Sequence, residues 1–277
     1  ETAMYAHVFL PGSSFLEKNG TFTNAERRIS RVRKVMAPKN GYEDWEITQM
    51  LSNALGYPMN YKHASEIMDE VAQLTPTFKG VSYEKLDKLE SIQWPCNDEF
   101  PEGTPTMHVD EFVRGKGKFF ITEYVPTVEK VNGKFPLIMT TGRILAHYNV
   151  GAQTRRTKNT EWHDEDLIEI HPHDAEERGI NERDWVGINS RSGDTVLRAK
   201  ITNKVQPGVV YTTFHHPVSG ANVITTDNSD WATNCPEFKV TAVQVTKVTQ
   251  PSNWQSKYQK FSEKQIDFVK NGEEKVS

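Results

Sequence analysis

Cysteine is scarce in this chain. Only Cys96 and Cys235 occur among the 277 residues, far apart and outside any Cys-x-x-Cys pair. Their scarcity excludes an iron–sulfur cluster or a cysteine-based structural zinc site within this sequence. Such sparse cysteine is typical of a reducing compartment, and we expect a cytoplasmic protein. Long apolar runs are also missing, and no stretch approaches the ~20 residues that cross a bilayer, so no membrane span is predicted.

Common catalytic and nucleotide-binding motifs are absent as well. There is no nucleophile elbow, no GxGxxG, no Walker sequence and no HExxH. The formal net charge of −4 argues against a general nucleic-acid binder, which is usually basic. The histidine pairs at 171/173 and 215/216 do not predict a metal site. Helix capping explains the first pair, and adjacent residues of an extended chain point to opposite faces.

Short strands joined by turns dominate the second half of the chain. Strands are predicted at 136–141, 167–171, 185–191, 195–203, 208–214 and 239–247. A short helix is predicted at 174–179, with His173 or Asp174 as its N-cap and Gly179 as its stop. Six strands and one helix in about 115 residues favour a small closed β-barrel.

The first part of the chain predicts an α/β segment with a helical insert. Apolar runs predict strands at 5–10 and at 119–124. A helix is predicted from the Asp44 cap to Gly56, another from about Ser65, and a third over 83–89. The predicted domains are 1–126, the barrel at 135–248 and a C-terminal arm at 249–277. The opening residues lack a signal-peptide pattern, and we interpret the chain as a piece of a longer polypeptide.

A dense basic run lies near the N-terminus. It comprises Arg27, Arg28, Arg31, Arg33 and Lys34. An anion contact is one interpretation. We favour a solvated edge strand or an interdomain salt-bridge face, because Ile29, Val32 and Val35 are interspersed in the run and the chain is acidic overall.

Residues 137–156 stand out as a candidate binding segment. An apolar strand breaks at Gly142 and is followed by polar and basic side chains, beginning with Arg143. A Thr-Gly-Arg turn presents backbone N–H groups and a guanidinium together, which suits a phosphate or another anion. An ordinary strand-to-loop turn with solvated arginines is the alternative.

A second candidate is the long polar loop from His215 to Lys239. Long polar loops in compact domains are usually functional or disordered. Trp231, Pro236 and Phe238 indicate that this one is packed, and Lys239 suits a phosphate or a ring carbonyl. A surface cover over one end of the barrel is the alternative.

Several segments together resemble a known family. They are Thr141-Gly-Arg-Ile-Leu-Ala-His-Tyr-Asn-Val-Gly-Ala-Gln-Thr-Arg-Arg, Ile170-His-Pro-His-Asp-Ala-Glu-Glu-Arg-Gly-Ile, Asn222, and Pro236-Glu-Phe-Lys239. These segments resemble the C-terminal domain of molybdopterin oxidoreductases of the dimethyl sulfoxide reductase superfamily. The likeness extends to formate dehydrogenase alpha (catalytic) subunits, and residues 5–13 and 17–28 are similar to the family's central region.

The resemblance implies a double-psi β-barrel covering a bis(pyranopterin guanine dinucleotide) cofactor with molybdenum or tungsten. It implies that dinucleotide-lining residues include Thr141, Gly142, Arg143, Ile144, Leu145, Tyr148 and Asn149. His147 and Gln153 are expected to be hydrogen-bond partners, and Asn222 and Lys239 match cofactor-contacting residues. His216 and Phe238 are expected to bind the cofactor as well, and Phe214 to lie near the substrate funnel.

The resemblance also implies parts that this sequence does not carry. The family's cysteine cluster for an iron–sulfur centre cannot be placed here, nor can the Cys or selenocysteine that ligates the metal. We therefore expect no catalytic residue and no metal ligand in this chain, and no activity from the chain alone. The implied partners are the rest of the catalytic subunit and electron-transfer subunits. The expected reaction is two-electron oxidation of formate to carbon dioxide.

Three alternatives to formate oxidation remain. One is a nitrate reductase-type member of the same superfamily. Another is a non-catalytic barrel that binds a protein partner through the acidic turn from Trp162 to Asp166 and the basic run at 27–34. The third is a stand-alone nucleotide-binding protein.

Overall fold

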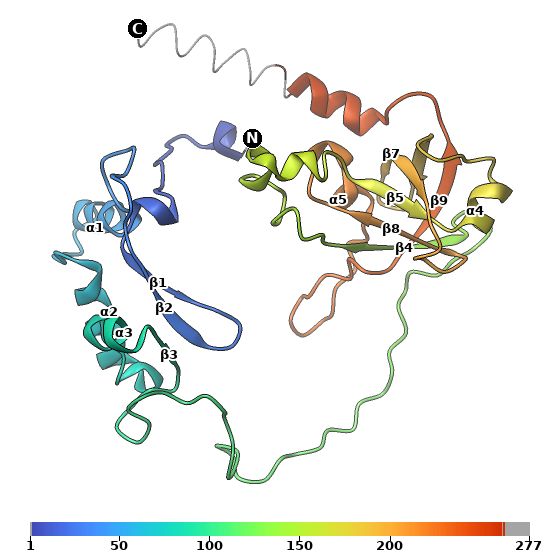
Figure 1. The fold of residues 1–277 in the computed structure, drawn as a ribbon. Helices are drawn as coiled ribbons and strands as arrows, with labels where there is room; N and C mark the ends of the chain where they lie inside the picture. The colour runs from blue at the N-terminus through green and yellow to red at the C-terminus, as the bar shows by residue number, and fades with distance from the viewer. Residues whose placement is uncertain (1, 262, 264–277) are drawn as a thin grey trace, which may run out of the picture. The chain divides into compact units, whose positions relative to one another are not determined.

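The computed structural model describes residues 2–261 and 263. It divides into two compact units, residues 2–121 and the residues from 122 onward, and each is described by itself (Figure 1). The three-part domain division proposed from the sequence stays a prediction.

The first unit is built on a three-stranded antiparallel sheet. Its strands are β1 (Gly20–Thr23), β2 (Arg28–Val32) and β3 (Ser91–Gln93), in the order β1-β2-β3. Its helices are α1 (Asp44–Ala54), α2 (Ala64–Leu74) and α3 (Tyr83–Leu89), with short 3-10 helices at Thr2–Tyr5, Phe15–Glu17 and Pro76–Phe78. Ile29 of β2 pairs with Ile92 of β3, and both are buried with Leu86 of α3 in one apolar core. The three predicted helices are confirmed.

Two strand predictions in this part of the chain are wrong. Residues 6–10 have no regular structure, and Phe9 is 67% exposed. Phe119 and Ile121 are 99% and 100% exposed on irregular chain. An apolar run becomes a strand only when a neighbour takes up its hydrogen bonds and covers one face. No strand of the described residues does so for either run.

The N-cap of helix α1 lies one residue before the predicted Asp44. This N-cap is Glu43, whose backbone N–H donates to the Glu46 carboxylate at 2.7 Å. Asp44 instead accepts the Ser13 backbone N–H at 2.8 Å and pairs with Lys18. The carboxylate predicted to cap the helix therefore anchors the preceding segment.

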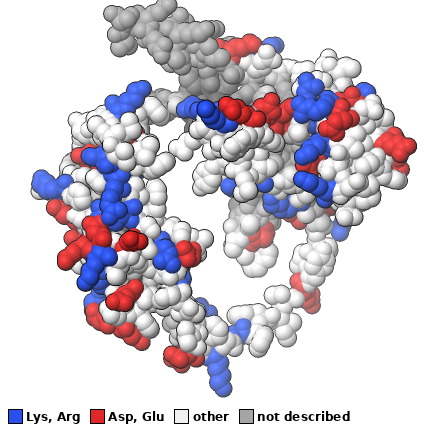
Figure 2. Space-filling view, in the orientation of Figure 1, with Lys and Arg blue, Asp and Glu red and all other residues white. Residues whose placement is uncertain are grey.

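The basic run forms a paired face on the sheet. Arg31 and Arg33 bind the same carboxylate, Asp87, at 2.9 and 2.8 Å. Lys34 pairs with Glu43 at 2.9 Å. Figure 2 shows basic and acidic side chains interspersed over this unit. These salt bridges lie within the unit, so the predicted interdomain face stays a prediction, and the edge-strand interpretation is wrong because β2 is the central strand.

The second unit is a closed six-stranded barrel. Its strands are β4 (Leu137–Gly142), β5 (Leu167–Ile170), β6 (Trp185–Asn189), β7 (Asp194–Ile201), β8 (Val209–Thr213) and β9 (Thr241–Lys247). They close in the order β4-β8-β5-β7-β6-β9. The pairs β4/β8 and β5/β7 are parallel, and the other four are antiparallel. The six predicted strands and the double-psi barrel class are confirmed.

Alternation along the strands fills the barrel interior. In β4, Leu137, Met139 and Thr141 are buried, whereas the residues between them are partly exposed. Apolar side chains from the six strands form one core, with members in every strand. A period of two is what a pleated strand with one buried face requires.

Helices and turns complete this unit. The helix α4 (Pro172–Glu177) has His171 as its N-cap, so the predicted caps His173 and Asp174 are wrong. The His171 Nδ1 accepts the His173 backbone N–H at 3.2 Å. The helix α5 (Ala221–Ile224) lies in the long loop, and 3-10 turns occur at Thr154–Arg156, Lys158–Glu161 and Pro217–Ser219. Residues 253–261 are helical, and no described helix is long and apolar enough to cross a membrane.

Candidate functional site

Three segments, distant in sequence, meet at one edge of the barrel because of strand direction. β4 and β8 are parallel neighbours, with Gly142 opposite Thr213, so the chain leaves both strands at the same edge. β9 runs antiparallel to β4, with Thr241 opposite Met139, so the residues just before β9 reach that edge too. The binding segment predicted after β4 and both ends of the 215–239 loop therefore converge.

Gly142 is required where the first of these segments begins. A Cβ at this position would lie 2.4 Å from the Tyr211 hydroxyl oxygen and 2.6 Å from its ring. The Tyr211 hydroxyl also lies 3.4 Å from the Arg143 carbonyl oxygen, to which it donates. The Thr-Gly-Arg turn thus packs against the Tyr211 ring of β8, and only glycine at position 142 allows this contact.

Arg143 is held at the surface by two contacts. Its guanidinium donates to the Asn149 side-chain oxygen at 2.8 Å and lies 5.5 Å from the centroid of the Phe214 ring. Phe214 packs in turn against the His215 ring, with centroids 5.2 Å apart. The structure therefore brings the predicted residues Arg143, Asn149 and Phe214 together.

Lys239 and Phe238 close the same edge from the β9 side. The Lys239 ammonium donates to the Thr141 carbonyl oxygen. The Thr141 hydroxyl donates to the Phe238 carbonyl oxygen at 3.0 Å. These cross-links place the amine of Lys239 beside the turn that carries Arg143.

His215 joins the loop after β4 to the loop after β8. Its Nε2 accepts the Ile144 backbone N–H at 3.1 Å, and its Nδ1 is hydrogen-bonded to the Asn149 carbonyl oxygen. The first contact needs a free lone pair and the second needs an N–H, so the ring is neutral with its proton on Nδ1. His215 is completely buried.

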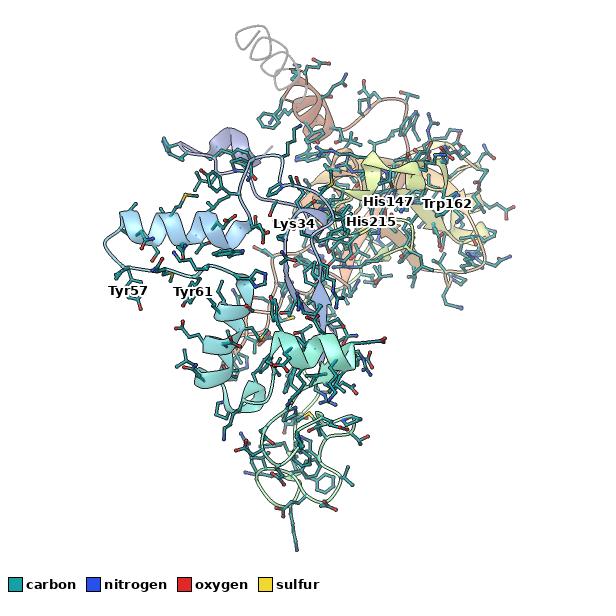
Figure 3. All side chains as sticks on the ribbon, turned by 60° about the vertical axis from the view of Figure 1, so that its left-hand side comes forward. Lys34, Tyr57, Tyr61, His147, Trp162 and His215 are labelled. Atoms are coloured by element: carbon teal, nitrogen blue, oxygen red, sulfur yellow. The ribbon has the colours of Figure 1, made fainter. Side chains whose placement is uncertain are left out.

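His147 and His216 lie inside this edge. Both ring nitrogens of His147 have protein partners, Thr154 Oγ1 at 3.0 Å and the His163 carbonyl oxygen at 2.7 Å. The His216 ring packs edge-on against His147, with centroids 5.1 Å apart, and is 8% exposed. Neither of its nitrogens has a hydrogen-bond partner among the described residues. Figure 3 shows His147 and His215 in the same region of the barrel unit.

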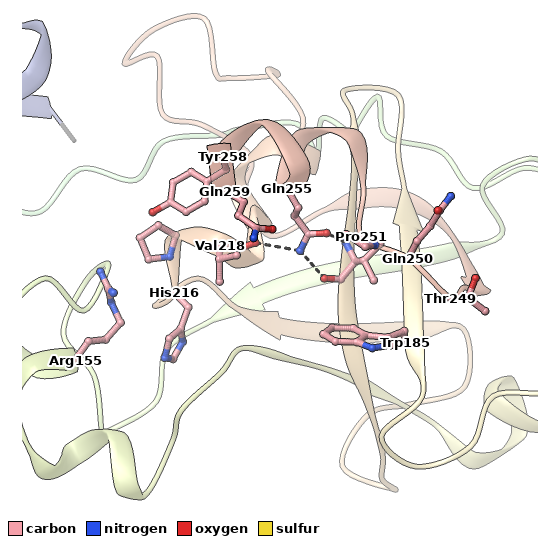
Figure 4. A pocket seen from close by; sticks show the side chains of 12 residues that line it. Arg155, Trp185, His216, Val218, Thr249, Gln250, Pro251, Gln255, Tyr258 and Gln259 are labelled. Atoms are coloured by element: carbon pink, nitrogen blue, oxygen red, sulfur yellow. Dashed lines mark hydrogen bonds between the residues drawn. The ribbon is translucent and has the colours of Figure 1, made fainter. Parts of the chain in front are cut away.

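The remaining predicted residues form the rim. Leu145, Tyr148 and Gln153 are exposed, Tyr148 at 69%. Asn222 and Phe238 line a hollow of ≈ 680 Å³ together with residues of the 225–228 segment. Arg155 and His216 line one end of a second hollow, ≈ 560 Å³, whose other end holds Trp185 (Figure 4).

The long loop is packed only in its first half. Ala221, Ile224, Thr225 and Thr226 are buried, as expected for a packed loop. Trp231 is 97% exposed, Phe238 is 41% exposed and Pro236 is exposed as well, so the packing expected of these three residues is wrong. The short helix α5 supplies the apolar anchors for the first half, and Asp230 organises the exposed second half by accepting hydrogen bonds from Ala232, Thr233 and Cys235.

The sequence reasoning missed Tyr211, His215 and Asp166. Asp166 is 2% exposed, although the sequence placed it in an acidic surface turn. A carboxylate immediately before a barrel strand is the only signal that the sequence offered for it. Strand pairing, which brings residue 166 beside residues 213–216, is a tertiary feature.

A possible cation site lies elsewhere in the same unit. His173, Asp174 and Glu177 present ligand atoms within 4.8 Å of one another in the part of the chain that the structure describes. Asp174 is already engaged, since it accepts the Gly208 N–H at 2.8 Å and lies near Arg178. Contacts within the unit therefore account for Asp174, and metal binding is not assigned to the group.

The site's chemistry suits a large anionic ligand. Arg143 and Lys239 stand at one edge, and neither has an ion-pair partner among the described residues. The closed mixed barrel that carries this edge matches, over residues 137–242, a family model described as "Molydopterin dinucleotide binding domain". A model described as "Molybdopterin oxidoreductase" matches residues 1–54. The chain belongs to the molybdopterin oxidoreductases.

Curated relatives agree with this membership. The F420-dependent formate dehydrogenase subunit alpha of Methanocaldococcus jannaschii is 41% identical over 90% of this chain and 38% of its own length. Subunit alpha of F420-dependent formate dehydrogenase 1 of Methanococcus maripaludis is 39% identical over the same shares. A putative formate dehydrogenase of Staphylococcus aureus is 36% identical over 90% of this chain and 26% of its own length. The chain thus spans 38% of the length of the first of these relatives.

A solved structure shares the fold. Acetylene hydratase from Pelobacter acetylenicus aligns with a TM-score of 0.66, covering 86% of this chain and 38% of that chain. At 16% identity, this likeness shows the fold alone.

Proposed function

We propose that this chain covers and holds the pterin cofactor of an enzyme that oxidises formate. The observation that carries the proposal is the convergence of Arg143 and Lys239 at one barrel edge, together with the Gly142 turn. Positive side chains without acidic partners, beside exposed backbone, favour a phosphate-bearing ligand. The formate dehydrogenase alpha subunits among the relatives support the choice of substrate.

The proposed cofactor is the bis(pyranopterin guanine dinucleotide) form with molybdenum or tungsten. Arg143 and Lys239 would neutralise its pyrophosphate charge. Tyr148, Gln153 and Asn222 are exposed and offer hydrogen-bonding groups to its polar edges. His216 fits the same role through Nε2, which is buried and has no hydrogen-bond partner among the described residues, whereas its Nδ1 faces Asp166 at 3.4 Å. Phe214 lies beneath Arg143, where we propose that it borders the substrate funnel.

The chain's own part in the reaction is to bind and orient. Formate oxidation releases carbon dioxide, one proton and two electrons, and the bound metal cofactor would supply the redox chemistry. Arg143 and Lys239 fix the anionic part of the cofactor, and the barrel wall beneath them is a packed apolar core. Catalysis in such enzymes depends on protein groups for binding and electrostatics rather than for the redox step.

The metal ligand and the iron–sulfur cluster would come from other parts of the enzyme. Cys96 is buried in the core of the first unit, and Cys235 is exposed. Neither matches the family's metal-ligating residue, so we propose that the chain alone does not oxidise formate. We also propose a cytoplasmic complex with electron-transfer subunits. The formate dehydrogenase relatives favour formate over nitrate.

The partner-binding alternative is less well supported. Asp166, one end of its proposed acidic turn, is buried. The basic run that would form its other surface is neutralised by acidic neighbours within its own unit.

The test compares Arg143→Ala and Lys239→Ala in the intact enzyme. Each substitution removes a charge-assisted contact worth about 1.5–3 kcal/mol, so pterin occupancy should fall by about tenfold or more at limiting cofactor. Formate-dependent dye reduction should fall in proportion, while activity per bound pterin stays constant. Released-pterin fluorescence and metal analysis measure occupancy.

Lys200→Ala is the matched control. Lys200 is a barrel lysine that pairs with Glu169 at 2.9 Å on β7 and β5. Its loss should leave pterin occupancy at the wild-type level. Full occupancy in both test variants, with normal folding, would overturn the proposed role of this edge.

A further inference from the structure

Asp166 is a buried carboxylate without a Lys or Arg partner among the described residues. It lies just before β5 and is 2% exposed. The His216 Nδ1 lies 3.4 Å from its Oδ1, long for a hydrogen bond. Burying a charge in this way is costly unless its oxygens are well hydrogen-bonded. The Asp166 carboxylate therefore needs hydrogen-bond donors that compensate for its burial.

The Asp166 carboxylate accepts three hydrogen bonds from residues 213–216. One oxygen, Oδ1, accepts the Thr213 hydroxyl and the His215 backbone N–H, the latter at 3.1 Å. The other, Oδ2, accepts the His216 backbone N–H at 2.8 Å. Burial by itself would raise the pKa of Asp166, but the adjacent His216 ring, the Thr213 hydroxyl and the His216 backbone N–H together outweigh it and hold the pKa well below the usual value. The Asp166 carboxylate therefore fixes the backbone of the residues that follow β8.

His215 connects Asp166 to the loop after β4. The backbone of His215 is held by Asp166, and its ring holds Ile144 and Asn149. Asn149 has φ of +49°, a left-handed conformation that needs outside support in a residue other than glycine. The side chain of the same Asn149 accepts from Arg143. The contacts thus run without a break from Asp166 to the guanidinium of Arg143.

We infer that Asp166 is the positioning residue of this edge, fixing Arg143 for the cofactor through His215 and Asn149. The inference rests on the proposed function for its ligand, but its geometry concerns residues of this chain alone. Asp166 itself does not touch the ligand. Its removal should loosen the 144–149 loop first, because the Asp166 carboxylate contacts residues 213–216 and the His215 ring contacts Ile144 and Asn149.

The central variant is Asp166→Asn. An amide keeps one acceptor oxygen but turns an NH₂ group towards a backbone N–H, so one of the three contacts becomes a clash of donors. Two measurements on the full chain follow: hydrogen exchange of the Ile144 amide, and the NMR signature of the His215 ring proton on Nδ1. We expect exchange to accelerate about tenfold and the ring signature to broaden or move.

Ligand binding is measured on the same samples with guanosine diphosphate as the probe. Its dissociation constant should rise about tenfold, because Arg143 then has to be ordered on binding. Glu165→Gln is the matched control, since it removes the neighbouring carboxylate, whose ion pairs within the described part of the chain are with Arg183 and Arg198. Ile168→Val, in the barrel core, controls for lost stability alone. Both controls should leave the Ile144 exchange and the His215 signature as in the wild type.

The outcomes separate the inference from the function on which it rests. Unchanged Ile144 exchange and an unchanged His215 signature in a folded Asp166→Asn variant overturn the positioning role. Faster exchange with unchanged affinity for guanosine diphosphate supports the positioning role and contradicts the nucleotide-binding function of this edge. If Asp166→Asn does not fold, Thr213→Val removes one contact, and about threefold faster Ile144 exchange is then expected. No acceleration in a folded Thr213→Val variant overturns the inference.

Discussion

At the scale of single residues, the site depends on the close contact between the Gly142 backbone and the Tyr211 ring. Gly142 ends β4 in contact with the Tyr211 ring, and the next residue carries the guanidinium of the binding edge. Any side chain at 142 would push the ring of β8 away from the turn. Glycine here serves packing, since its backbone conformation is not among the left-handed ones.

We predict that Gly142→Ala destabilises the barrel by about 1–3 kcal/mol, the range for overpacking a fitted site. Gly133→Ala is the control, because a Cβ at 133 meets nothing within 4 Å. Urea unfolding measures both. In the double variant Gly142→Ala/Tyr211→Ala, the loss in free energy of unfolding should be smaller than the sum of the two single-variant losses, because Tyr211→Ala removes the clash. Full additivity would contradict the packing explanation.

Asp166 also predicts how stability responds to acid. Its pKa is lowered in the folded state, below the unfolded value of about 3.9. The carboxylate therefore contributes its full stability above the unfolded pKa, and that contribution falls as the pH drops below it. Urea unfolding between about pH 6 and pH 3 should show a steeper loss for wild type than for Asp166→Asn. Equal slopes would show that Asp166 is not a source of the acid sensitivity.

At the scale of elements, strand direction assembles the site. The parallel pairing of β4 with β8 makes their outgoing loops neighbours, and the antiparallel pairing of β4 with β9 adds Lys239. Reversing either strand would place these segments at opposite ends of the barrel. The candidate site is therefore formed by the residues at the strand ends and not by the faces of the strands.

The side chain of Gln255 links the C-terminal helix at 253–261 to the barrel. The Gln255 amide donates to the carbonyl oxygens of Val196 and Val218 at 2.8 and 3.1 Å, and its oxygen accepts the Val196 N–H at 3.1 Å (Figure 4). The side chain thus satisfies both backbone groups of Val196. Trp254 adds apolar contact, because its ring lies against Gly220.

We predict that Gln255→Ala releases this helix while the barrel stays folded. Losing these hydrogen bonds, each worth about 1 kcal/mol, should speed amide exchange at 256–260 by about tenfold or more. Gln259→Ala is the control, because the Gln259 amide donates only to Glu263 among the described contacts. Hydrogen exchange followed by mass spectrometry measures both variants. Equal exchange in the two would show that Gln255 does not hold the helix.

At the scale of the whole chain, each unit has its own core. Ile29, Leu86 and Ile92 centre the first, and residues from all six strands fill the second. Family models match a part of each unit, and the curated relatives match 90% of the chain. The chain therefore combines two recognisable parts of a molybdopterin oxidoreductase, of which the barrel carries the candidate site.

The sequence by itself determined the elements with strong local signals. Period-two apolar runs bounded by turns located the six barrel strands, and helical spacing with caps located α1, α2 and α3. The Thr-Gly-Arg turn and Lys239 were also recognisable, because their residue types limit the chemistry that they perform. Local pattern failed at 5–10 and 119–124, where apolar runs found no strand to pair with.

Only the tertiary structure decided which residues work together. Asp166 reads as a surface acid, and His215 as half of a histidine pair, until β5 and β8 lie side by side. Tyr211 constrains Gly142 only because the parallel strands are in that register. Strand pairing depends on contacts between residues tens of positions apart, and a local sequence pattern holds no information on such contacts.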